Sequence, residues 1–209
     1  MHRRSIVKGI EKLEKHPLAK ALIFDLDGTL SDSLPVHQMS WEMTCARYNC
    51  RFDSAIVPLL TGMPTARFAE RIIADNHLQG VTPGEMVRIK QELFWKYVYL
   101  VKPNPQVIAL VYKWRGILPM AVGTGASRRS AELQLQQLGI TDCFMAVVAA
   151  DDVERHKPEP DTFLRCAALM ETPPSCCQVF EDGALGMQAA TRAGMFVTDV
   201  RPFTQNPTM

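Results

Sequence analysis

The chain has 209 residues, of which 47% are hydrophobic and 22% are charged, and its formal net charge is +1. This length suggests one domain, or one domain that carries an insertion, and the hydrophobic fraction excludes wholesale disorder. Because 23 basic residues are balanced by 22 acidic ones, no general attraction to nucleic acid is expected, and any charged ligand must be bound by a local cluster.

Cysteine usage and hydropathy indicate the compartment. None of the six cysteines forms a pair at zinc-binding spacing, and the adjacent Cys176 and Cys177 are poorly placed to bridge each other, so free thiols in a reducing compartment are expected. No apolar run approaches the ~18–20 residues of a membrane span, and charged residues follow the basic N-terminus where a signal peptide would be apolar. We therefore expect a cytoplasmic protein with neither a membrane nor a nucleic-acid partner.

The first predicted elements are a helix and a buried strand. Residues 3–15 carry apolar side chains at helical spacing and Pro17 ends the pattern, which predicts a helix within an N-terminal extension over residues 1–18. The apolar run 19–24 then ends abruptly in Asp25-Leu26-Asp27-Gly28-Thr29. This pattern is typical of a buried strand that runs into a loop.

The interval 33–101 contains no comparable strand. Apolar spacing predicts one helix around residues 39–48 and another around residues 68–73. Thr82-Pro83-Gly84-Glu85 is typical of a helix start, with Thr82 as the N-cap and Glu85 completing a capping box, and the apolar pattern continues to Leu100. We predict a separate helical cap domain over residues 33–101, inserted into a core that consists of residues 1–32 and 102–209.

The rest of the chain alternates strand and helix patterns. Helices are predicted at roughly 105–115, 128–138, 161–171 and 185–193, and strands at 117–122, 144–149, 178–180 and 195–200. This alternation predicts right-handed βαβ units and a parallel sheet, whose strands show continuous apolar runs because both of their faces are buried. The predicted fold class is α/β, with a doubly wound, Rossmann-like core.

Polar side chains follow four of the predicted strands: Asp25 and Asp27, Thr124, Lys157, and Glu181 with Asp182. In a doubly wound sheet ligands bind at the carboxyl ends of the strands, so these groups are expected to converge. Clustered carboxylates need a cation, and oxygen ligands without Cys or His favour a hard ion such as Mg²⁺. Lys157 and Thr124 would complement a phosphate, and an aspartate can serve as a nucleophile that forms an aspartyl phosphate.

These motifs resemble those of the haloacid dehalogenase-like (HAD) superfamily. Asp25-Leu26-Asp27-Gly28-Thr29 is similar to its first motif, and the second, third and fourth motifs are matched by Thr124, Lys157 and Glu181-Asp182-Gly183. The similarity is in the family's order and covers residues 19–200. The inserted helices resemble the helical cap of the β-phosphoglucomutase-like branch.

The resemblance implies a separate role for each of the acidic residues. Asp25 would attack phosphorus, and Asp27 would protonate the leaving oxygen and then take a proton from water. Mg²⁺ would be held by the Asp25 carboxylate, the Asp27 backbone carbonyl and Asp182, with Glu181 behind them and not itself a ligand. An acid at position 27 favours phosphate chemistry over dehalogenation, since a leaving halide needs no proton.

Substrate contacts are implied on both sides of the cleft. Thr124 and Lys157 would hold the phosphoryl group. The cap would close over the core and exclude water, with hinges near Leu30–Ser33 and Val101–Pro103. The candidate cap residues are His37, Gly62, Met63, Arg67 and Lys90.

Several of these cap assignments stay open. His37 could orient Asp27 or contact substrate, and an ordinary packing or surface role competes for His37, Arg67 and Lys90. Thr65 stands where the mutase carries a basic residue that holds a second phosphate, and Arg67 could replace that residue.

The sequence therefore predicts a Mg²⁺-dependent phosphatase that hydrolyses a small sugar phosphate, of the fructose-1-phosphate kind, through a phospho-Asp25 intermediate. One alternative is a β-phosphoglucomutase, which would keep the phosphoryl group and transfer it within the sugar. Another is a non-catalytic binding protein on the same fold, which the intact set of Asp25, Asp27, Lys157 and Asp182 argues against. The sequence does not identify the sugar, and we expect a monomer.

Overall fold

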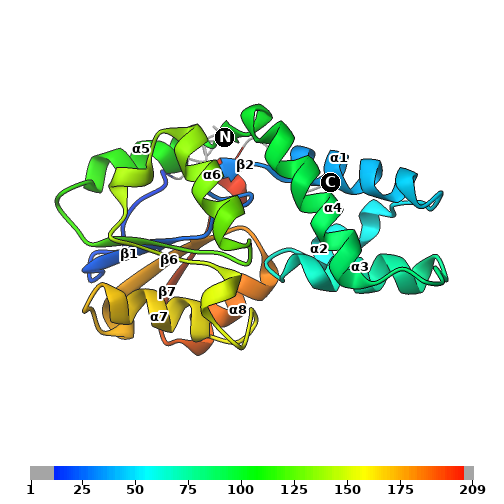
Figure 1. The fold of residues 1–209 in the computed structure, drawn as a ribbon. Helices are drawn as coiled ribbons and strands as arrows, with labels where there is room; N and C mark the ends of the chain where they lie inside the picture. Colours follow the sequence, from blue (N-terminus) through cyan, green and yellow to red (C-terminus); the bar gives the residue numbers. More distant parts are fainter. Residues whose placement is uncertain (1–11, 205–209) are drawn as a thin grey trace, which may run out of the picture.

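The computed structural model describes residues 12–204, which form an α/β core with a group of helices at one side (Figure 1). Most of the predicted N-terminal helix, residues 3–11, lies outside the described residues, and residues 12–16 are not helical. Tertiary contacts hold this segment instead. Leu13 is buried in the core, and Gln178 accepts a hydrogen bond from the backbone N–H of His16 (2.6 Å) and donates one to Glu14 O (3.2 Å).

The core contains a five-stranded parallel sheet in the order β5-β4-β1-β6-β7. Its strands are β1 (Ala21–Phe24), β4 (Met120–Gly123), β5 (Ala146–Val148), β6 (Cys177–Glu181) and β7 (Phe196–Asp199). In the central strand, Leu22 lies opposite Met120 on one side and Gln178 on the other. The parallel doubly wound sheet that the alternating pattern predicts is confirmed.

Helices cover both faces of the sheet (Figure 1). They are α5 (Pro105–Trp114), α6 (Arg128–Leu138), α7 (Asp161–Leu169) and α8 (Ala184–Arg192). Leu22 and Phe24 pack in one buried cluster with side chains of α5 and α6, whereas Ala21 and Ile23 pack in another with side chains of α7 and α8. Successive residues of a strand point to opposite faces, so a strand covered on both faces must be apolar throughout.

The inserted helices have a hydrophobic core of their own. They are α1 (Leu34–Arg47), α2 (Val57–Leu60), α3 (Thr65–Asp75) and α4 (Pro83–Tyr97), and we refer to them together as the cap. Their buried cluster contains Trp41, Cys45, Ile56, Ile72 and Met86, among others. Helix α4 begins as predicted, with Thr82 Oγ1 accepting a hydrogen bond from Glu85 N (3.2 Å).

The cap is joined to the core by a two-stranded antiparallel ribbon. Strand β2 (Ser31–Asp32) pairs with β3 (Lys102–Pro103), with Ser31 opposite Pro103 and Asp32 opposite Lys102. The chain enters and leaves the cap side by side through these strands. They lie within the two segments predicted as hinges, and their hinge motion stays a prediction.

Short 3-10 helices complete the secondary structure: Ser54–Ile56, Val98–Leu100, Thr141–Cys143, Ala150–Asp152, Pro174–Cys176 and Arg201–Phe203. Within residues 12–204, none of the helices combines the length and the apolar character that a bilayer span requires.

Candidate active site

The centre of the site is a buried lysine between two carboxylates. Asp25 directly follows β1, Glu181 ends β6, and Lys157 lies in the segment between β5 and α7. Lys157 Nζ donates to Asp25 Oδ1 at 2.6 Å and to Glu181 Oε2 at 2.7 Å, and all three residues are buried. The strand ends therefore bring together groups that are 132 and 24 residues apart along the chain.

Burial and charge shift the pKa values of this cluster in opposite directions. Burial and the neighbouring Glu181 raise the pKa of Asp25 well above its usual range, although Lys157 opposes the shift. Burial alone would lower the pKa of Lys157, but Asp25 and Glu181 outweigh it and hold that pKa above its usual range. Lys157 is therefore positively charged and lies against the carboxyl group of Asp25.

A third carboxylate, Asp182, lies next to this cluster. Thr29 Oγ1 donates to Asp182 Oδ1 at 2.9 Å, and burial together with the Glu181 charge raises the pKa of Asp182 to about 7. Gly28 has φ +89, and a Cβ at this position would lie 2.2 Å from Asp182 Oδ2. Glycine is therefore required here both by the backbone conformation and by the close approach of Asp182.

The carboxylates fit a hard divalent cation. Asp25, Glu181 and Asp182 each offer an oxygen, and these oxygens all lie within 4.8 Å of one another. Both oxygens of Glu181 are already occupied, Oε2 by Lys157 (2.7 Å) and Oε1 by the backbone N–H of Asp182 (3.1 Å) and of Gly183 (2.8 Å). Three carboxylates face one ammonium, so a cation bound by Asp25 and Asp182 would offset the excess negative charge.

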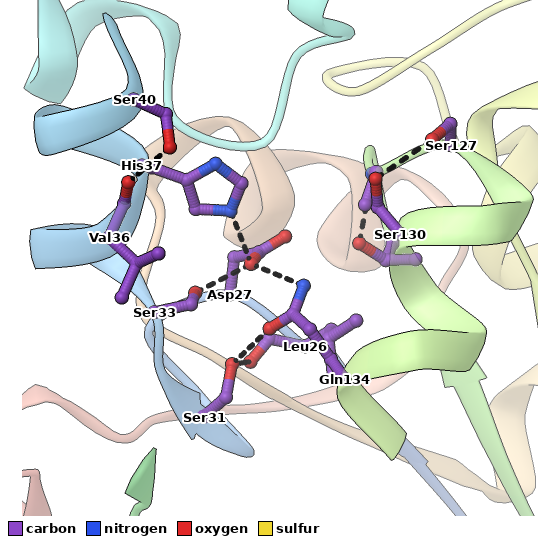
Figure 2. Close-up of polar contacts among 12 residues, drawn as sticks. Leu26, Asp27, Ser31, Ser33, Val36, His37, Ser40, Ser127, Ser130 and Gln134 are labelled. Atoms are coloured by element: carbon purple, nitrogen blue, oxygen red, sulfur yellow. Dashed lines mark hydrogen bonds and ion pairs between the residues drawn. The ribbon is translucent and has the colours of Figure 1, made fainter. Parts of the chain in front are cut away.

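Asp27 is held by three donors that converge on a single oxygen (Figure 2). Its Oδ1 accepts from Ser33 Oγ at 2.6 Å, from His37 Nε2 at 2.8 Å and from Gln134 Nε2 at 2.9 Å. Burial acts to raise the pKa of Asp27, but His37 and these hydrogen bonds outweigh it and hold the pKa below its usual range. Without substrate, Asp27 is therefore a carboxylate whose orientation is fixed.

The cap brings a lysine to the far side of His37. Lys90 Nζ lies 2.5 Å from His37 Nδ1 and 4.9 Å from the centre of the Phe94 ring, on which the His37 ring also stacks. Burial, followed by the Lys90 charge, lowers the pKa of His37, and burial lowers the pKa of Lys90 to about 8. A neutral imidazole fits this arrangement: Nδ1 accepts from Lys90, and Nε2–H donates to Asp27.

A cavity of about 580 Å³ lies between the core and the cap. The core contributes Asp25, Asp27, Thr124 and Asp182 to its wall, and the predicted cap residues His37, Gly62, Met63 and Lys90 lie on the other side. Thr124 is buried, and its Oγ1 accepts from Ala126 N at 3.0 Å, which leaves its own hydroxyl proton free for a ligand.

The cap loop touches the core at two glycines. A Cβ on Gly125 would lie 2.5 Å from Gly62 O, and a Cβ on Gly183 would lie 3.4 Å from Thr61 Cγ2. In this structure the cap is therefore closed over the site, with backbone packed against backbone at Gly125.

Arg67 is not brought to the cavity. Its guanidinium is exposed on α3 and pairs with Glu70 at 2.9 Å, one helical turn away. Thr65, two residues earlier, does line the cavity. In this conformation Arg67 therefore does not take the place of the basic residue that the mutase carries in its cap loop.

Three residues that sequence reasoning missed also contribute to the site. Asn104 Nδ2 donates to Gly28 O (3.0 Å) and to Thr29 O (2.7 Å), which fixes the loop after β1, and Arg201 lines the cavity. Gln134 contacts Asp27. Its one sequence signal is that a polar residue lies on the apolar face of a helix, beside Ala131 and Leu135.

Comparison with known proteins gives a consistent result. The family model of haloacid dehalogenase-like hydrolases matches residues 19–194. The chain is 44% identical to the fructose-1-phosphate phosphatase YqaB of Escherichia coli, over 86% of this chain and 95% of that protein. It is 28% identical to the β-phosphoglucomutase of Bacillus subtilis, over 87% of this chain and 83% of that protein. Among solved structures, a β-phosphoglucomutase from Clostridium difficile shares the fold, with a TM-score of 0.77, 22% identity, and coverage of 87% of this chain and 84% of that one.

Proposed function

Because the chain belongs to the haloacid dehalogenase-like hydrolase family and is a phosphoric monoester hydrolase, we propose that it hydrolyses a small sugar phosphate, of the fructose-1-phosphate kind, through a phospho-Asp25 intermediate. The observation that carries this proposal is that Asp25, bonded to Lys157, shares one cavity with Asp27, whose Oδ1 is fixed by three hydrogen bonds. The similarity to a named fructose-1-phosphate phosphatase supports the choice of substrate class.

In the first half of the reaction, a carboxylate oxygen of Asp25 forms a bond to phosphorus as the bond between phosphorus and the sugar oxygen breaks. The leaving oxygen takes a proton from Asp27. Because Asp27 is a carboxylate before substrate binds, it must first take up that proton from solvent. Lys157 and the Thr124 hydroxyl bind the phosphoryl oxygens and offset their charge. The products of this half are the free sugar alcohol and phospho-Asp25.

In the second half, Asp27 is a carboxylate again and accepts a proton from water. The water oxygen bonds to phosphorus as the bond to Asp25 breaks, which releases inorganic phosphate and restores both aspartates. Asp25, Asp182 and the Asp27 carbonyl would hold Mg²⁺, which when bound supplies positive charge against the phosphate and the nucleophile.

The lining of the cavity favours a phosphatase over a mutase. A mutase must hold a substrate that carries a second phosphate, which needs a cation at the sugar end of the site. The sugar would face the cap side of the cavity, which is lined by residues that include Thr65, Trp41 and Phe68, whereas Arg67 pairs with Glu70 outside the cavity. Two cationic side chains occur among the described lining residues, and both are already paired: Lys90 with His37, and Arg201 with Asp199.

A phosphate-release screen tests the proposal. Purified protein is assayed with and without Mg²⁺ on hexose, pentose and aldonate phosphates, including fructose 1-phosphate, and Asp25→Asn serves as the inactive control. We expect Mg²⁺-dependent release from at least one sugar phosphate and none from the variant. Interconversion of sugar phosphates without release would favour the mutase, and no turnover of any phosphate would favour a binding protein.

A further inference from the structure

Gln134 occupies an unusual place for a glutamine. It lies on α6 of the core and is fully buried, with an exposed fraction of 0%. Its amide bonds a carboxylate and a hydroxyl. Nε2 donates to Asp27 Oδ1 at 2.9 Å, and Oε1 accepts from Ser31 Oγ at 2.8 Å (Figure 2). A buried amide is stable only when its polar atoms are paired, and both ends of this one are paired within the site.

We infer that Gln134 is a positioning residue for Asp27, which aims the Asp27 carboxyl group at the leaving oxygen of the substrate. This inference rests on the proposed function, because it concerns the proton that Asp27 gives to the leaving group.

The direction of the three hydrogen bonds on Asp27 supports this role. Ser33 and His37 both come from the start of the cap segment and approach Asp27 from the α1 side, whereas Gln134 approaches from α6 (Figure 2). With Ser33 and His37 alone, Asp27 would be hydrogen-bonded from the α1 side only. The hydrogen bond from Gln134 on α6 adds a second direction and so fixes the orientation in which Asp27 faces the cavity.

The second bond of Gln134 explains why the residue itself is held in place. Ser31 belongs to β2, and its hydroxyl lies 3.0 Å from Leu26 O as well as 2.8 Å from Gln134 Oε1. Gln134 thus links α6, the ribbon that leads to the cap and the acid–base carboxyl group. If Asp27 carries its proton on Oδ2, its Oδ1 can still accept from Gln134 Nε2, so this hydrogen bond can be kept in both protonation states.

The leaving group provides a test that separates positioning from general damage. A sugar alkoxide is a poor leaving group and needs the proton of a well-aimed acid, whereas p-nitrophenolate leaves readily without one. Loss of positioning should therefore slow hydrolysis of fructose 1-phosphate far more than hydrolysis of p-nitrophenyl phosphate. Loss of fold, metal or nucleophile would slow both alike.

The variant is Gln134→Met, which keeps the length of the side chain and removes both hydrogen bonds. We expect the ratio of kcat/KM for fructose 1-phosphate to kcat/KM for p-nitrophenyl phosphate to fall about 10- to 100-fold, mainly through kcat. Gln136→Met is the matched control, because Gln136 is exposed on the same helix, and its ratio should equal that of the wild type. An unchanged ratio in Gln134→Met, or equal losses on both substrates, would overturn the inference.

Ser31→Ala is the second variant, and it decides the question if Gln134→Met does not fold. Ser31→Ala leaves the Gln134 side chain in place but removes the hydrogen bond that Ser31 donates to it. The ratio of the two kcat/KM values should therefore fall by a smaller factor than in Gln134→Met. An unchanged ratio would count against the inference. Failure of the proposed function looks different, because the wild type would then release no phosphate from fructose 1-phosphate or from any other sugar phosphate.

Discussion

Substitution of Gly125 by alanine should separate cap closure from overall stability. The added Cβ would stand 2.5 Å from Gly62 O and 2.9 Å from Gly62 C, which are backbone atoms of the cap loop and cannot rotate away. The backbone of Gly125 itself is not in the left-handed region, so the substitution adds a steric conflict and little local strain. The conflict exists only while the cap is closed.

The size of the effect follows from this geometry. Overpacking a well-packed contact costs about 1–3 kcal/mol, and here opening of the cap can relieve that cost. The closed state should therefore lose roughly 5- to 150-fold in relative population, and kcat/KM for a sugar phosphate should fall by a similar factor. The free energy of global unfolding should change by less than about 1 kcal/mol, since a cap that opens carries no strain.

Two measurements on the same proteins check this reasoning. Phosphate release from fructose 1-phosphate gives kcat/KM, and urea unfolding gives the free energy of unfolding. Gly84→Ala is the matched control, because a Cβ there meets no atom within 4 Å, and it should leave kcat/KM unchanged. If Gly125→Ala keeps the wild-type kcat/KM, catalysis does not require the contact between Gly125 and the cap loop. If the free energy of unfolding falls as much as the activation free energy rises, the substitution acts on folding and not on cap closure.

Three further predictions concern the charged cluster. Asp25→Asn should lower phosphate release by at least about 10³-fold while circular dichroism remains native, and residual turnover near the wild-type rate would exclude Asp25 as nucleophile. Lys157→Met leaves two buried carboxylates without their shared partner and should lower the free energy of unfolding by about 3–5 kcal/mol in EDTA and by less in Mg²⁺, as measured by urea unfolding. Burial and Glu181 raise the pKa of Asp182 to about 7, so the folded protein holds a proton that the unfolded chain loses near pH 4. In EDTA the free energy of unfolding should therefore fall as pH rises from about 4 to about 7, Mg²⁺ should reduce the fall, and a rise over that range in urea titrations would contradict the assignment.

The core could be predicted because its strands are buried on both faces. A strand such as Ala21–Phe24 leaves a continuous apolar run in the sequence, and the acidic residues at its end mark the edge where ligands bind. The ribbon of β2 and β3 and the helix α2 were not predicted, since elements of two and four residues are too short to show a period. The helix predicted over residues 3–15 was wrong for residues 12–15, where contacts with Gln178 and the core override local spacing.

The residues of the site likewise differ in how well the sequence predicts them. Asp25, Asp27, Lys157 and Asp182 stand in recognisable local motifs, so their convergence follows once the strand order is known. Gln134 stands in no motif, because its role depends on which turn of α6 faces Asp27, and only the packed structure fixes that. The monomeric state stays a prediction.

The β2–β3 ribbon also bears on how such a chain can diversify. Asp32 and Lys102 are direct partners across the ribbon, so the backbone on the core side could be closed by a turn of two residues in place of the whole insertion. Segments of very different length can therefore be spliced between these positions without altering the register of the parallel sheet. The chain of the core could therefore remain continuous across this ribbon whichever segment is inserted there.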